Sequence, residues 1–77
     1  MKYKVLESKA TPNGRMFCEL VSFNNCGSIV YQTHVYETID GNNYKELYRS
    51  YPIGKKVTAL VTFKKYCNTY LRQKHKY

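Results

Sequence analysis

The chain has 77 residues, which allows one small domain and excludes a multi-layer enzyme core, a crossover nucleotide-binding sheet and a two-domain clamp. Its 43% hydrophobic and 23% charged residues are typical of a folded chain rather than a disordered one. Nine Tyr and three Phe make it rich in aromatic residues, and 13 Lys and Arg against 5 Asp and Glu give a net charge of +8. We therefore expect one domain, residues 1–77, with a basic surface.

The chain shows no targeting segment. No apolar stretch follows the lysines of the N-terminus, so no secretory signal is predicted. The longest strongly apolar run, residues 59–61, is far too short to span a membrane. Cys18, Cys26 and Cys67 are an odd number of thiols, and without a signal we expect them to be reduced in a cytoplasm.

Four turn signals divide the chain at intervals that suit a small all-β module better than a βαβ unit. The first combines a Pro, which presets φ, with an Asn-Gly pair, which favours a tight hairpin. The four signals are residues 11–14, 24–28, 40–43 and 52–54.

Three strand-like segments lie between the first turns, at residues 2–10, 15–23 and 29–39. The second has apolar residues on both faces, which indicates a central strand or a bulge partway along it. The third alternates more cleanly, with Tyr31 facing the core and His34 pointing outward. These segments predict a three-strand meander.

Residues 43–51 break the alternation and predict a short helix of about two turns. Asn43 and Glu46 have the spacing of a capping box, and Pro52 disfavours helical geometry in the residue before it. The face at i, i+3, i+4 and i+7, which we expect to point inward, consists of Tyr44, Leu47, Tyr48 and Tyr51.

Residues 56–63 carry the clearest strand pattern, in which every second side chain is apolar and faces inward, while Leu60 is expected to face outward. The predicted core combines this strand with the first three. Its members are Val57, Ala59, Val61, Phe63, Val5, Phe17, Val21, Ile29, Tyr31 and Val35.

The last segment, residues 65–77, fits two structures. As a helix it continues an apolar stripe from Phe63 through Tyr66 and Leu71. The absence of acidic residues and the presence of Asn and Thr weaken the helix, so we favour a strand that begins near Thr69.

The predicted fold class is mostly β: a three-strand meander, a short helix, then two strands. This element order resembles that of small five-stranded OB-like barrels, in which a helix closes one end. The alternatives are an SH3-like barrel and an open antiparallel sheet packed on one helix. Barrel closure would also remove the exposed edges that make small sheets aggregate.

The sequence offers little for catalysis or metal binding. His34 and His75 are the only histidines, and together with Lys or Arg they could in principle cleave RNA by acid–base chemistry. An exposed strand histidine and a tail histidine explain them better, and Cys26 has no evident base beside it. Cys18 and Cys67 complete a possible zinc set, but the spacings lack the short pairs that zinc sites use. We predict no enzyme, metal or cofactor.

The charge is concentrated at one end. Residues 1–54 carry six bases and five acids, a net of +1, whereas residues 55–77 carry seven bases and no acid, a net of +7. Such asymmetry is typical of proteins that bind polyanions. Basic side chains that follow phosphates and aromatic faces that stack bases are what single strands require. The predicted nucleic-acid-binding residues are Lys56, Lys64, Lys65, Tyr66, Tyr70, Arg72, Lys74 and Lys76.

We therefore expect a small non-catalytic module that binds single-stranded nucleic acid with weak sequence preference. The alternative is a phage- or virus-encoded interaction protein, either an inhibitor of a host protein or a virion accessory part, that docks on an acidic protein surface in the host cytoplasm. Tyr residues would then anchor a protein interface. A homodimer would add core that so small a domain lacks.

Overall fold

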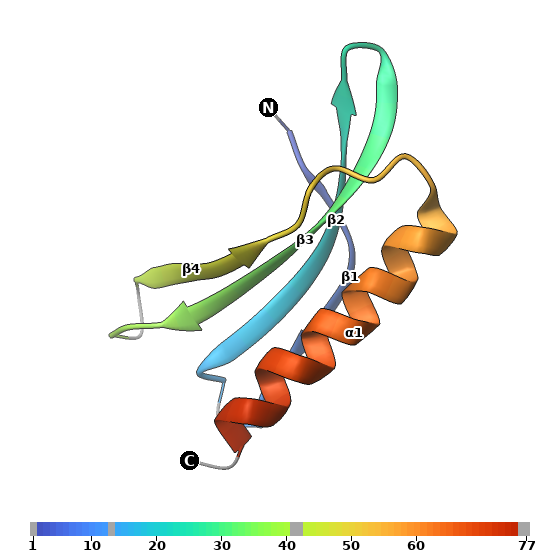
Figure 1. The fold of residues 1–77 in the computed structure, drawn as a ribbon. Coiled ribbons are helices and arrows are strands. Elements are labelled where there is room, and N and C mark those ends of the chain that lie inside the picture. Colours follow the sequence, from blue (N-terminus) through green and yellow to red (C-terminus); the bar gives the residue numbers. More distant parts are fainter. Residues whose placement is uncertain (1, 13, 41–42, 76–77) are drawn as a thin grey trace.

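The structure, a computed structural model, describes residues 2–12, 14–40 and 43–75, with side chains through Leu71. Four strands and one helix follow one another along the chain (Figure 1): β1 (Lys4–Ala10), β2 (Met16–Asn25), β3 (Ser28–Thr38), β4 (Tyr44–Arg49) and α1 (Lys56–His75). The strands pair antiparallel in the order β1-β2-β3-β4, so β1 and β4 are the two edges of an open sheet.

The mostly β class and the three-strand meander are confirmed, as is the alternative of an open antiparallel sheet packed on one helix. The described residues contain no fifth strand, and their sheet does not close, because β1 and β4 each pair with one neighbour only. The segment after β4 is tied to β3 by an isolated bridge between Tyr31 and Ile53, with both N–H···O distances at 2.8 Å.

The hairpin between β2 and β3 forms where the turn signal predicts it. Asn25 pairs with Ser28, and the two residues between them have positive φ, 53° at Cys26 and 88° at Gly27. Two successive left-handed residues match the twist of the flanking strands. The Asn24 side-chain oxygen accepts a hydrogen bond from the Gly27 N–H at 2.9 Å, which fixes the turn locally.

The predicted helix at residues 43–51 is wrong, because this segment is strand β4. Asn43 does not cap a helix; its N–H donates to the Asp40 carboxylate at 3.1 Å and closes the turn from β3. A bulge lies in the β3–β4 pairing, and both Leu47 and Tyr48 pack toward the core. One extra residue in a strand breaks the period of two, so the spacing imitated a helical stripe. Tyr44 and Tyr51, predicted inward, are exposed.

The predicted strand at residues 56–63 is also wrong, because this segment opens α1, and the helical alternative for the following residues is the observed one. Ala59 and Phe63 are buried, as predicted, whereas Val57 and Val61 are 75% and 63% exposed. Leu60, predicted to face outward, packs against the core. A helix turns by about 100° per residue, so residues two apart point to nearly opposite sides.

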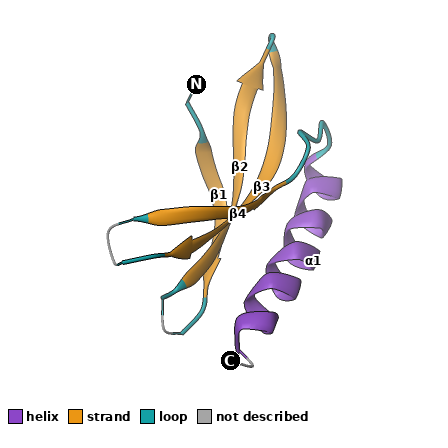
Figure 2. Ribbon diagram, turned by 60° about the vertical axis from the view of Figure 1, so that its left-hand side comes forward, coloured by secondary structure: helices purple, strands orange, loops and turns teal. Residues whose placement is uncertain are grey.

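The core lies between α1 and one face of the sheet, where α1 packs on β2 and β3 (Figure 2). Val21 and Val35 are buried as predicted, and Phe17 and Tyr31 are half-buried. The cluster between helix and sheet consists of Met16, Cys18, Leu20, Val35, Ala59, Phe63, Cys67 and Leu71.

Four other residues of the predicted core are not in this cluster. Phe17 and Val21 lie on the face of the sheet opposite α1, because they alternate along β2 with the residues of the cluster. Val5, on edge strand β1, is 50% exposed, and Ile29, beside the β2–β3 turn, is 54% exposed. Both satisfy the alternation of a strand, but α1 covers neither position: Val5 pairs with Val21 on the face of the sheet opposite α1, and Ile29 lies in the β2–β3 hairpin, which extends beyond the end of α1 (Figure 1). Among the described helices, none has the length and apolar character to cross a bilayer.

Candidate functional site

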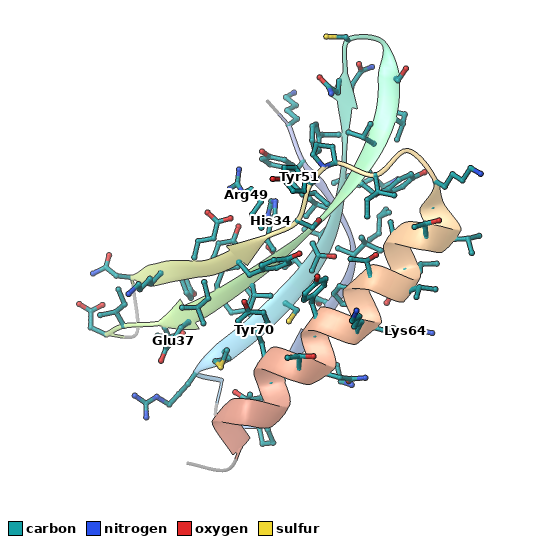
Figure 3. All side chains as sticks on the ribbon, in the orientation of Figure 1. His34, Glu37, Arg49, Tyr51, Lys64 and Tyr70 are labelled. Atoms are coloured by element: carbon teal, nitrogen blue, oxygen red, sulfur yellow. The ribbon has the colours of Figure 1, made fainter. Side chains whose placement is uncertain are left out.

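The exposed side chains of α1 include lysines near both ends of its described length. Lys56, Lys64 and Lys65 are all exposed, and α1 contains no acidic residue. In Figure 3, Lys64 extends from α1 away from the sheet, whereas Tyr70 lies between α1 and the strands. The helix therefore places an apolar stripe against the sheet and turns Lys64 and Lys65 outward, together with Val57 and Val61.

The N-terminal end of α1 is basic where a stable helix would be acidic or capped. The Lys55 carbonyl accepts the first helical hydrogen bond from the Ala59 N–H at 3.0 Å, which makes Lys55 the N-cap residue. A lysine side chain has no acceptor for the free N–H groups of the first turn. The positive end of the helix dipole also disfavours Lys55 and Lys56. These lysines therefore do not serve the stability of the helix.

The two tyrosines predicted to stack on bases pack on the sheet. The rings of Tyr66 and Tyr70 stack on Tyr48, with centroids 4.4 Å and 5.7 Å away. Burial and a side-chain hydrogen bond with Tyr66 raise the pKa of Tyr48 to about 12. Tyr66 also has the Lys65 ammonium 5.8 Å from its ring centroid. Both rings are half-buried, so their main contacts are within the fold.

The remaining predicted contacts lie at the C-terminal end. Arg72 and Lys74 belong to α1, but their side chains, like Lys76 as a whole, lie outside the described residues. The structure therefore brings Lys56, Lys64 and Lys65 onto one helix.

His34 is buried on the face of the sheet opposite α1, contrary to the prediction that it points into solvent; it is only 2% exposed. Its Nε2 lies 2.6 Å from the Gln32 side-chain oxygen, and its Nδ1 lies 3.1 Å from the Tyr36 hydroxyl. The Gln32 amide nitrogen donates to the Ser50 carbonyl at 2.9 Å, which orients its oxygen toward the ring. Nε2 therefore carries the proton, and Nδ1 accepts from Tyr36.

This arrangement favours neutral His34. Burial, and next the positive charge of Arg49, lower the pKa of His34 below its ordinary value. Figure 3 shows His34 and Arg49 near each other. Arg49 itself is paired with Glu46, with 2.6 Å between Nε and Oε1. A histidine with both ring nitrogens engaged and almost no exposed surface is poorly placed to act as a general base.

Sequence reasoning missed an aromatic surface on the face of the sheet that α1 leaves open. The rings of Phe17 and Tyr36 stack at 5.0 Å, and Tyr44 meets Phe17 edge-on at 5.2 Å. Tyr3 contacts Phe23 edge-on at 5.2 Å. The apolar residues on both faces of β2 were the signal for this surface, since one face alone is covered by α1.

The candidate metal ligands are separated. Cys18 and Cys67 are buried next to each other in the core, where burial and a hydrogen bond with Cys67 raise the pKa of Cys18. Cys26 is exposed at the β2–β3 turn, and His34 lies on the other side of the sheet. Among the described residues no three His, Cys, Asp or Glu side chains form a group that could hold a metal ion.

Comparison with protein-family models, with curated proteins and with solved structures found no match to this chain.

Proposed function

We propose that the protein is a small non-catalytic module that binds nucleic acid through the basic outer face of α1. The observation that carries this proposal is the exposure of Lys56, Lys64 and Lys65 on a helix without acidic residues. All five acids of the chain lie in residues 1–54, so no carboxylate on this helix neutralises the lysines. Lysines clustered along a helix form the electrostatic footprint that phosphates require.

The cost of this charge to the fold supports the same proposal. Lys55 and Lys56 occupy positions at which Asp, Ser or Glu would stabilise the helix. An anionic partner would offset that cost, because its phosphates interact favourably with the lysines.

The tyrosines have a different role in this proposal from the one expected. Tyr66 and Tyr70 hold α1 against Tyr48 through stacked rings and are half-buried. The phosphate contacts are therefore assigned to Lys56, Lys64 and Lys65, with Arg72, Lys74 and Lys76 as further contacts along the same segment.

The proposal is tested by fluorescence anisotropy with labelled single and double strands across a range of salt concentrations. Changing Lys64, Lys65, Arg72 and Lys74 to Gln lowers the net charge from +8 to +4 (8 − 4). Affinity should fall by orders of magnitude. The log–log salt slope should flatten by about 0.7 per lost contact on a single strand and about 0.9 on a duplex.

A matched control separates position from net charge. Changing Lys2, Lys4, Lys9 and Lys45 to Gln also lowers the net charge from +8 to +4, but on β1, β4 and the N-terminus. This variant should retain most of the affinity. Equal losses in the two variants would contradict a site on α1, and no binding of the wild type at about 50 mM salt would end the proposal.

The second candidate is the interaction protein that docks on an acidic protein surface. Tyr51, which is 90% exposed just before α1, favours it, because exposed tyrosines are common anchors of protein interfaces. This candidate becomes the better one if neither single nor double strands bind at low salt.

A further inference from the structure

The outer face of α1 carries more than charge. Val57 and Val61 lie one turn apart and are 75% and 63% exposed. β-Branched residues are weak helix formers, and these two contribute little to the core because most of their surface faces water. Lys64 and Lys65 follow Val61 by three and four residues and lie on the same side of the helix. Lys56, seven residues before buried Phe63, is instead in line with the inner stripe. Neither helix stability nor packing explains an exposed apolar pair beside two exposed lysines.

Apart from Lys64 and Lys65, the exposed side chains around this pair are short. Thr58, Asn68 and Thr69 are exposed on the same outward side, and the Thr69 hydroxyl donates to the Lys65 carbonyl at 2.9 Å, which keeps it close to the backbone. The positions from Val57 to Asn68 span about 16 Å along the helix, or roughly five base pairs of duplex. The outer face is therefore a narrow ridge that a groove can accept.

The position of α1 in the fold leaves this ridge accessible. In Figures 1 and 2, α1 is a separate layer on one side of the sheet, and its outward side faces no other described element. An α-helix with its side chains is about 10–12 Å across, and the major groove of B-form DNA is about 12 Å wide. The major groove of A-form double-stranded RNA is too narrow and deep for side chains to read.

We infer that the outer face of α1 enters the major groove of double-stranded DNA, with Val57 and Val61 against thymine methyl groups and Lys64 and Lys65 on the flanking phosphates. This inference rests on the proposed function and specifies its substrate class. Thymine is the only base that presents a methyl group in the major groove, and apolar side chains recognise it. Stacked Tyr66 and Tyr70 fit a duplex better than a single strand, because a duplex needs no aromatic platform.

The test compares three labelled probes at about 50 mM salt: a DNA duplex rich in A·T pairs, one of its separated strands, and the RNA duplex of the same sequence. We expect the DNA duplex to bind most tightly. A second DNA duplex carries uracil in place of thymine, which removes the methyl group and leaves the charge of the backbone unchanged. It should bind the wild type about fourfold more weakly for each methyl contacted.

Two variants identify the contact. The double variant Val57→Ser, Val61→Ser should bind thymine and uracil duplexes equally, and it should melt close to the wild-type temperature because both positions are exposed. Val5→Ser is the matched control, since Val5 is a half-exposed valine on edge strand β1 and does not belong to α1. This control should retain the preference for thymine.

The outcomes separate this inference from the proposed function. Equal binding of thymine and uracil duplexes by the wild type, or tighter binding of the single strand or RNA duplex, overturns the groove contact. Salt-dependent binding would still support the proposed function in that case. No binding to any probe overturns both.

Discussion

The two sides of α1 differ in what holds their residues in place. On the inner side, Ala59, Phe63 and Cys67 are almost completely buried against β2 and β3. On the outer side, Val57 and Val61 are mostly exposed and lie near Lys64 and Lys65. The inner residues are explained by the free energy gained when apolar surface leaves water. The outer residues have no such explanation within the fold, which is what a surface that contacts a partner would show.

Aspartate substitutions on the two sides should have the largest and most unequal effects. Phe63→Asp places a charge in the core and should unfold the domain, since the cost of several kcal/mol is comparable to its whole stability. Leu60→Asp, at a half-buried position, should cost about 1–3 kcal/mol. Val61→Asp should change stability by less than about 0.5 kcal/mol. Chemical denaturation measures all three, and a large loss in Val61→Asp would show that its side chain is packed.

A smaller effect is expected at the N-terminal end of α1. Lys55→Asp should stabilise the fold by about 1 kcal/mol, because Asp at the N-cap accepts a backbone N–H and interacts favourably with the helix dipole. The same variant should bind nucleic acid more weakly than the wild type. Thermal melts and anisotropy on the same preparation check both results, and a variant that binds as tightly as the wild type would show that this end of α1 does not contact the ligand.

The smallest effect is expected at His34, on the face of the sheet opposite α1. Its ring nitrogens are hydrogen-bonded within the fold, unlike the exposed lysines of α1. Because the folded state lowers the pKa of His34, the unfolded chain binds the proton more readily. The contribution of His34 to stability should be constant above about pH 6.5 and fall as the pH drops below that value. Below the pKa of the folded state this contribution should change no further, because both states are then protonated. Denaturation curves over this range should show the decline in the wild type.

His34→Gln is the control for this pH dependence. The variant should be less stable at neutral pH, because the Tyr36 hydroxyl loses its partner, and its stability should lack the decline attributed to His34. A wild-type and a variant curve that run parallel would contradict the assignment of the titration to this residue.

The meander could be predicted from the sequence because hairpin turns are local. The Asn-Gly signal at residues 11–14 and the Cys26-Gly27 turn act through a few neighbouring residues, and the strands they join are next to each other in the sheet. The basic character of the C-terminal segment was equally evident, since charge depends on composition alone. Lys64 and Lys65 were correctly expected on the surface.

The segment that became β4 could not be assigned locally. Its spacing of apolar residues fits a helix and a bulged strand equally well, and the bulge is a property of its pairing with β3. The partner that satisfies its backbone groups lies elsewhere in the chain. The helix propensity and the spacing of apolar residues within 43–51 carry no information about that partner strand.

What the sequence by itself determined was the three hairpin-linked strands, the position of the breaks and the concentration of charge at one end. Only the tertiary structure decided the side to which the residues of α1 point. Ala59 and Phe63 face inward in both a strand and a helix, because four residues are two strand repeats and about one helical turn. Val57 and Val61 have the same spacing, but in a helix they lie on the side opposite Ala59 and Phe63. The physical reason is that Ala59, Phe63, Cys67 and Leu71 form one apolar stripe at helical spacing, and this stripe is buried against β2 and β3.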